Sequence, residues 1–179
     1  MAWSTPLTAV ANAVLTAAQW NASVRDNLLE TVPAKATAAS QIPVSTGANA
    51  MAMRTPAADF VSATETTTST SFVALATAGP AVTVTCGTRA IVFLFSWVRN
   101  NTVNGTAIAG YAVTGASAVG AGDNQALELM SAVSNQSARM TAVFYQQALT
   151  SGSNTFTMQY RVNAGTGTFA DRRIFVIPQ

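Results

Sequence analysis

The chain has 179 residues, of which 49% are hydrophobic and only 9% are charged. A soluble domain usually has about 25% charged residues, and here Thr, Ser, Ala, Asn and Gln take their place, a composition typical of β-rich proteins that are covered by copies of themselves or by a larger assembly. High hydrophobicity with a formal net charge of +2 excludes a disordered chain, and the lack of histidine excludes Ser-His-Asp and Cys-His nucleophiles.

Cys86 is the one cysteine, so an intramolecular disulfide and a Cys/His zinc site are excluded, and we expect no metal and no cofactor. The nine basic residues form no stripe with aromatic residues, which argues against nucleic-acid binding. The longest apolar run, residues 90–98, is far shorter than the roughly 20 residues of a membrane helix, and the N-terminus lacks the pattern of a signal peptide. We therefore expect a protein that is made in the cytosol and binds neither nucleic acid nor membrane.

The first 59 residues are predicted to form an N-terminal arm with one short helix. Thr16 and Gln19 have the spacing of a capping box, and Leu15 and Trp20 have that of a hydrophobic staple. These signals predict that a helix begins at about residue 17.

One narrow apolar stripe follows from the spacing of Trp20, Val24 and Leu28 at i, i+4 and i+8. Pro33 is expected to end the helix at about residue 31, because the residue before a proline avoids the α region. A single helix this short is marginal in water, so we expect its stripe to pack on another protein. The rest of the arm, with a Ser-Thr-Gly turn at residues 45–47, is expected to be extended; the alternative for the whole arm is a flexible leader.

Residues 60–179 are predicted to form an antiparallel β-sandwich, with a jelly roll as the first choice, so that the fold class is mainly β. Polar and apolar residues alternate, and Gly, Asn and Ser separate the runs. Strands are expected near residues 70–77, 80–86, 89–99, 106–114, 125–132, 138–148, 154–162 and 172–177. Asn104-Gly105 predicts a hairpin turn between two of them.

The strand near residues 89–99 is apolar on both faces. Its side chains fall into two sets: Ile91, Phe93, Phe95 and Trp97 on one face, and Val92, Leu94 and Val98 on the other. A sandwich core covers only one of these faces, so a second surface must cover the other. We predict that Val92, Leu94 and Val98 form the interface of a homotrimer; the alternative cover is a loop of the same chain.

The arm resembles a known family in a series of short motifs, which are Trp3-Ser4-Thr5-Pro6, Val14-Leu15-Thr16-Ala17-Ala18, Asn21 and Val24-Arg25-Asp26-Asn27-Leu28-Leu29. They are similar to the N-terminal segment of many phage and prophage tail or head-decoration proteins, especially those of actinobacterial hosts. Residues 33–37 and 45–50 resemble the downstream part of that segment, and residues 151–156, 160–162 and 165–169 resemble the sandwich domains that follow it. Asn12, where the family usually has glycine, and Trp20 depart from the pattern. The resemblance implies a virion protein that is attached by its arm and whose β domain projects.

From these features we expect a non-enzymatic virion surface protein, either a capsid decoration or head-fibre protein or a short tail-associated one. Its partners would be further copies of itself and the major capsid protein or tail proteins of the particle. The residues expected to dock the arm are Trp3, Trp20, Val24, Arg25, Asp26 and Leu28. An ordinary solvated helix face is the alternative for Arg25.

The competing function is a receptor-binding minor tail protein that recognises a host-surface glycan. Sugar sites need exposed aromatic side chains beside polar or acidic groups in loops, and the candidates here are Asn101, Asp123 and Phe169. Residues 171–173, Asp-Arg-Arg, are expected to form a local ion pair at the start of the last strand. Asp123 and Glu128, five residues apart, are interpreted as surface residues and not as the carboxylate pair of a glycosidase.

Overall fold

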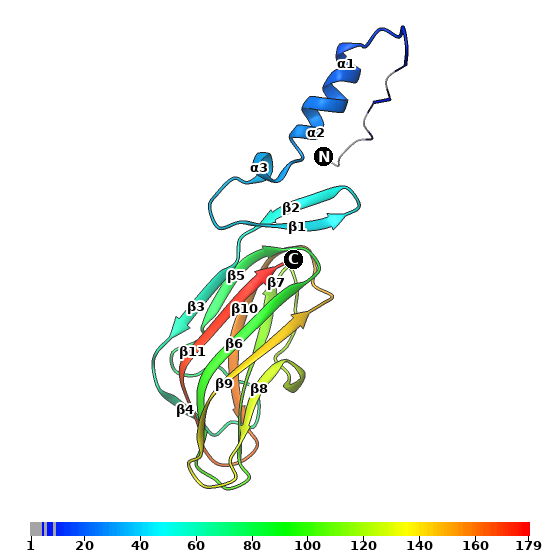
Figure 1. Ribbon diagram of the computed structural model, residues 1–179. Helices are drawn as coiled ribbons and strands as arrows, with labels where there is room; N and C mark the ends of the chain where they lie inside the picture. The colour runs from blue at the N-terminus through cyan, green and yellow to red at the C-terminus, as the bar shows by residue number, and fades with distance from the viewer. Residues whose placement is uncertain (1–4, 6, 9) are drawn as a thin grey trace. The chain divides into compact units, whose positions relative to one another are not determined.

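The computed structural model describes residues 5, 7–8 and 10–179, without the side chains of residues 32 and 33. The chain divides into two compact units, Met1–Thr55 and Pro56–Gln179. The structure is mainly antiparallel β, and α1, α2 and α3 all belong to the first unit (Figure 1). Residues 57–59, which the sequence assigned to the arm, are part of a strand of the second unit.

The helical segment of the arm begins at the predicted capping box. Thr16 Oγ1 accepts a hydrogen bond from the backbone N–H of Gln19 at 3.2 Å, and Gln19 Oε1 accepts one from the N–H of Thr16 at 3.0 Å. Helix α1 (Ala17–Trp20) continues into a π-helical turn (Asn21–Arg25) and then into α2 (Asp26–Leu28). The capping box is therefore confirmed.

The helix ends earlier than predicted, and Pro33 is not what ends it. Beyond α2, the N–H of Glu30 bonds to the carbonyl of Asn27 at 3.0 Å, which tightens the last turn. Pro33 is the second residue of α3 (Val32–Lys35), within a first turn that needs no backbone N–H from it. The predicted helix end at about residue 31 was wrong, because the helix ends at Leu28 and Pro33 lies inside the next helix.

A β-hairpin closes the first unit, where extended chain was predicted. Strand β1 (Ile42–Gly47) pairs antiparallel with β2 (Ala50–Arg54). The reversal comes after the predicted Ser-Thr-Gly turn and uses Asn49, whose φ of 55° is tolerated better by asparagine than by most residues. The prediction of unpaired chain was wrong here because the hairpin partner strand carries no clear alternation.

The second unit is a sandwich of two antiparallel sheets. Its strands are β3 (Ala57–Val61), β4 (Glu65–Thr67), β5 (Ala81–Cys86), β6 (Ala90–Asn100), β7 (Thr106–Gly115), β8 (Ala126–Met130), β9 (Ser137–Gln146), β10 (Gly152–Val162) and β11 (Gly167–Pro178). One sheet has the order β5-β10-β7-β8, and the other has the order β3-β11-β6-β9, with β4 also paired to β11. From β5 onwards every connection except β7 to β8 crosses between the sheets, as in a jelly roll. The predicted fold class is confirmed.

The strand near residues 70–77 is the one that was predicted wrongly. Those residues form an irregular connection with a single bridge from Val73 to Tyr160, and Phe72 lies over Gly110 of β7. The edge of the sheet beside β11 is formed by β3 and β4, which pair one after the other with β11. The turn at Asn104, with φ of 61°, is present, but it joins strands of different sheets and is therefore no hairpin.

Aromatic side chains from the β5-β10-β7-β8 sheet and from β11 fill much of the core. Tyr111, Phe156, Tyr160 and Phe169 are each at most 1% exposed. The rings of Tyr160 and Phe169 are 4.9 Å apart, and those of Tyr111 and Phe156 are 6.0 Å apart. Phe169, predicted to be a ligand-binding loop residue, is a core residue of β11, so that prediction was wrong.

A bulge in β11 decides which side chains of this strand point inward. The register with β6 shifts between Ala170 and Arg173, and Asp171 has φ of 48°. Arg172 is consequently fully buried and pairs with Glu65 at 2.9 Å, whereas Asp171 pairs with Arg139 at 2.9 Å. The predicted ion pair within residues 171–173 was wrong, because Arg172 points into the core and Asp171, on the outward side of the sheet, pairs with Arg139 instead.

Candidate assembly surfaces

The arm helix leaves most of its predicted docking residues accessible. Trp20 is 55% exposed and Leu28 59%, while Val24 is half-buried. The π-helical turn, in which the N–H of Asp26 bonds to the carbonyl of Asn21, is wider than an α-helical turn. The spacing of i, i+4 and i+8 therefore does not place the three apolar side chains on one straight stripe.

Trp20 and Val24 belong to an apolar groove between the helix and the segment before it. The backbone N–H of Leu7 donates a hydrogen bond of 2.9 Å to Ser23 Oγ, which holds that segment beside the helix. The groove has a volume of about 400 Å³ and is lined by Leu7, Thr8, Val10, Ala13, Val14, Leu15, Gln19, Trp20, Ser23 and Val24. Leu15 and Trp20, the predicted hydrophobic staple, thus line one groove.

Arg25 and Asp26 pair with each other, with Arg25 Nε 2.8 Å from Asp26 Oδ1. Both were expected to help dock the arm. The side chain of Arg25 is 62% exposed, so this is a surface pair that contributes little stability. Trp3, the remaining predicted docking residue, lies outside the described residues.

In the sandwich, the two faces of β6 have the opposite roles to those predicted. Val92, Leu94 and Val98 are fully buried in the core between the two sheets, so they cannot form an interface with another chain. The outward side chains are those of the other set. The reason is the limited volume of the core. Aromatic rings from the other strands occupy much of that volume, so the smaller aliphatic side chains of β6 complete the packing.

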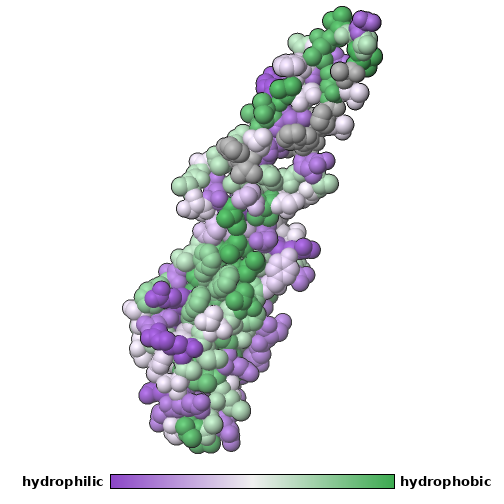
Figure 2. Space-filling model, viewed as in Figure 1, coloured by the Kyte–Doolittle hydropathy of each residue, from purple (hydrophilic) through white to green (hydrophobic). Residues whose placement is uncertain are grey.

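The outward side chains of the sheet β3-β11-β6-β9 form a broad apolar surface, which we call the aromatic face. Its apolar members are Ile91, Phe93, Phe95 and Trp97 of β6, Phe175 and Ile177 of β11, Val143 and Tyr145 of β9, and Phe60 of β3. In register, Phe93 lies between Phe175 and Val143. Figure 2, in the view of Figure 1, shows hydrophobic side chains gathered along β6 and β11.

The side chains of the aromatic face are accessible in the single chain. Val143 is 56% exposed, Tyr145 51% and Phe60 44%. The others shield one another, as Phe93 and Phe175 do with ring centroids 5.6 Å apart. Contiguous apolar surface of this extent is typical of a site that binds another molecule.

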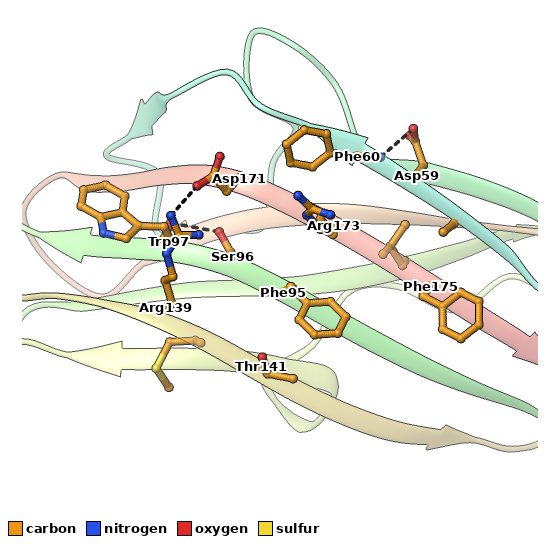
Figure 3. A pocket seen from close by; sticks show the side chains of 13 residues that line it. Asp59, Phe60, Phe95, Ser96, Trp97, Arg139, Thr141, Asp171, Arg173 and Phe175 are labelled. Carbon is orange, nitrogen blue, oxygen red and sulfur yellow. Dashed lines mark hydrogen bonds and ion pairs between the residues drawn. The ribbon is translucent and has the colours of Figure 1, made fainter.

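A hollow of about 810 Å³ opens in this face. Phe60, Phe95, Trp97 and Phe175 line it, and Figure 3 shows Arg173 between the rings of Phe60 and Phe95. At one end, Asp171 reaches across to Arg139, as the dashed line in Figure 3 marks.

Each arginine on or beside this face has a partner within it. Arg89 lies 5.9 Å from the ring of Tyr145, and Arg99 lies 5.8 Å from the ring of Trp97. Arg173 lies 4.1 Å from the ring of Phe60. These three guanidinium groups are attracted to the faces of the rings, and Arg139 is paired with Asp171.

The outward side of the other sheet is polar by comparison. Thr83 of β5 and Thr155 of β10 share a hydrogen bond of 2.8 Å across the strands. Thr85, Thr157 and Gln159 continue this surface. Such a face is stable in water without a cover.

The predicted ligand loops do not converge into a site. Asn101 Oδ1 accepts a hydrogen bond of 2.8 Å from the N–H of Thr166, and Asp123 accepts one of 2.9 Å from Arg161 Nε. Both side chains thus connect their loops to other parts of the sandwich, and Phe169 is buried. Among the described residues, no group of His, Cys, Asp and Glu side chains could hold a metal ion.

Sequence reasoning missed the partners of β6 on the aromatic face, namely Phe60, Val143, Tyr145, Phe175 and Ile177. A signal for part of them exists, because residues 174–177 are apolar at every position and so form a second strand with two apolar faces. Which strands share a sheet cannot be read from that pattern.

No protein-family model and no curated protein sequence matches the chain. Among solved structures, infectious bursal disease virus is similar at TM-scores of 0.44 (Gt strain, 10% identity) and 0.42 (Gx strain, 11% identity). The alignments cover 76% and 77% of this chain, which spans 37% of each viral chain. The arabinose-bound α-L-arabinofuranosidase MgGH51 is similar at a TM-score of 0.35 and 13% identity, over 82% of this chain and 24% of that one. Likenesses this distant carry no argument about function. Within the described part of the chain, no helix is long and apolar enough to span a membrane.

Proposed function

We propose that this chain is a non-enzymatic structural protein of a bacteriophage particle, exposed on the virion surface as a homotrimer and attached through its N-terminal arm. The observation that carries the proposal is the exposed apolar surface of the arm helix. Trp20, Leu28 and Leu29 are each more than half exposed. Their side chains stay in water unless another protein covers them.

The energetics of the arm favour attachment to a neighbour. Of the described helical residues in this unit, only Asn27 is buried, so the helix has little core of its own. Apolar burial stabilises by about 25 cal/mol per Å², and several hundred Å² of contact on a particle would outweigh part of the cost of association. The resemblance of residues 3–29 to phage arms supports the same reading.

The attachment point is a capsid or tail protein of the particle. A capsid decoration protein, a head-fibre protein and a short tail-associated protein would all use an arm in this way. The host cytoplasm is the site of synthesis, and the virion surface is the final location.

Several of the side chains with potential for chemistry are occupied in ion pairs. Lys35 Nζ lies 2.8 Å from the carboxylate of Glu30, and Asp123 is held by Arg161. Glu65 is held by the buried guanidinium of Arg172. With no histidine in the chain, these pairs leave little basis for acid–base catalysis.

The competing function, glycan recognition through the loops, has no support in the geometry. It required an aromatic platform beside polar groups, and Phe169 cannot provide one from the core. Asn101 and Asp123 have separate partners in separate loops.

The proposal is tested by the arm variant Trp20→Ser/Leu28→Ser in phage particles. Both side chains are exposed, so the variant should fold, and we expect it to be lost from purified particles because its docking surface is polar. Ala18→Ser, at an exposed position of α1, is the matched control and should be retained. Retention of the double variant at wild-type amounts, or absence of the wild-type chain from particles, would overturn the proposal.

A further inference from the structure

We infer that the aromatic face is the surface through which copies of this chain associate. The inference deepens the proposed function, since it identifies the contact within the homotrimer and replaces the interface predicted from Val92, Leu94 and Val98. It depends on the sandwich alone and makes no use of the arm.

The size of the aromatic face suits an interface between folded proteins. Strand β6 has 11 residues, and at about 3.3 Å for each residue and about 4.8 Å between strands, a four-stranded sheet offers roughly 700 Å². A stable interface buries about 800 Å² on each partner. The face therefore supplies nearly the whole of such a contact.

The composition of the face is that of an interface centre. It has six aromatic side chains, four of them on its middle strands, with arginine as the cation, and neither lysine nor glutamate among its outward residues. Aromatic residues and arginine are enriched at interface centres, and Lys and Glu are depleted. Arginine is also less strongly hydrated than lysine, so its burial costs less.

The charges indicate a second copy rather than a partner with an acidic surface. Arg89, Arg99 and Arg173 each lie over a ring of the face, and Arg139 pairs with Asp171. No carboxylate from outside is needed to position them. The same chain, with few acidic residues, can therefore cover this face.

The face also has both a recess and projecting side chains. It contains a hollow lined by Phe95, Trp97 and Phe175, and projecting apolar side chains on its edge strand, Val143 and Tyr145. A symmetric assembly needs both features on one chain, because every copy must provide what its neighbour receives. Association would then place the projections of one copy against the recess of the next.

The experiment compares one variant on each face by sedimentation of the full chain at micromolar concentrations. Val143→Arg places a charge on the aromatic face at a position 56% exposed in the single chain, so folding should be little affected. Thr85→Arg is the matched control, since Thr85 is also an exposed β-branched residue on an edge strand, β5, of the opposite face. We expect a trimer for the wild type and Thr85→Arg, and a monomer for Val143→Arg.

A wild-type monomer, or an oligomer that Val143→Arg leaves intact, would overturn the inference. If the wild type is monomeric and Val143→Arg prevents incorporation into particles, another virion protein covers the face. A dimer abolished by Val143→Arg would support the face and overturn the trimer of the proposed function. Circular dichroism checks folding, and Tyr145→Glu, beside Arg89, is the second variant should Val143→Arg misfold. Loss of arm attachment with an intact trimer would affect the proposed function alone.

Discussion

The outer faces of the two sheets differ in chemistry although both belong to one sandwich. On the sheet β5-β10-β7-β8, threonines such as Thr83 and Thr155 bond to each other across the strands. On the sheet β3-β11-β6-β9, rings such as Phe93 and Phe175 pack side by side and remain partly accessible. The backbone hydrogen bonds of both sheets form whatever side chains point outward. The fold therefore does not require the two outer faces to differ in chemistry.

This difference indicates where a further protein is needed. The hydroxyl groups on the outer face of the sheet β5-β10-β7-β8, which we call the threonine face, form hydrogen bonds with water. Exposure of the apolar aromatic face to water costs free energy, and burial against another protein would recover that free energy. A strand with two apolar faces is therefore a sequence feature that indicates assembly. Substitutions on one face at a time distinguish a role in the core from a role in assembly, and their effects are expected to decrease in the following order.

Leu94→Ala should have the largest effect, a loss of about 3 kcal/mol in the free energy of unfolding, because Leu94 is fully buried and the change leaves a cavity. Urea denaturation measures it, at a concentration of chain that is held fixed. The oligomeric state of the folded variant should be that of the wild type. A Leu94→Ala chain that is stable but monomeric would mean that the face assignment is reversed.

Glu65→Gln should lower the free energy of unfolding by about 2–3 kcal/mol, because it leaves the buried charge of Arg172 without its counter-ion. The pair lies at the bulge where Asp171 points outward and Arg172 points inward. Urea denaturation of both chains at pH 7 gives the difference, with Asp123→Asn, at an exposed ion pair, as the control. A cost no larger than that of the control would contradict this role.

The same pair predicts a dependence of stability on pH. Burial raises the pKa of Glu65, but the hydrogen bonds from Thr77 and the charge of Arg172 outweigh burial and lower that pKa below its ordinary 4.5. Its stabilisation is therefore present above pH 4.5 and is lost as the pH falls through the folded-state pKa. Thermal unfolding between pH 3 and 7 should show a steeper decline for the wild type than for Glu65→Gln, and equal slopes would argue against it.

Phe95→Ala should raise the dissociation constant of the oligomer by about 5- to 30-fold, since a ring at the centre of an interface is commonly worth about 1–2 kcal/mol. Sedimentation over a dilution series measures the change. The variant should unfold at nearly the wild-type urea concentration once both are fully dissociated, in contrast to Leu94→Ala.

Thr155→Val should have the smallest effect. It removes one exposed hydrogen bond to Thr83, and we expect a change within about 0.5 kcal/mol in the free energy of unfolding and none in the oligomeric state. A changed mass would show that the threonine face takes part in assembly.

Local patterns predicted much of this fold. The capping box of Thr16 and Gln19 was correct because it depends on residues three apart, and β5 to β11 were found because their alternation or turn residues are local. The short edge strands β3 and β4 were missed, since their pairing with β11 depends on contacts 100 or more residues away in the chain.

The candidate site was predicted only in part. That β6 has two apolar faces is visible in the sequence, but which set fills the core depends on the rings that other strands bring, such as Tyr111 and Phe156. The inward turn of Arg172 likewise follows from a bulge that shifts the alternation by one residue. Both errors arise from long-range packing, which residue spacing does not contain.

Hydroxyl-radical footprinting of the full chain at high and low concentration tests the contrast between the two faces most directly. Tyr145 and Phe60 report on the aromatic face, and Met130, 63% exposed on β8 of the other sheet, is the internal reference. We predict that the two aromatic residues are protected at high concentration and become reactive on dilution, while Met130 reacts equally at both. Equal reactivity of Tyr145 and Phe60 at both concentrations, in proportion to their exposure in the single chain, would contradict the account.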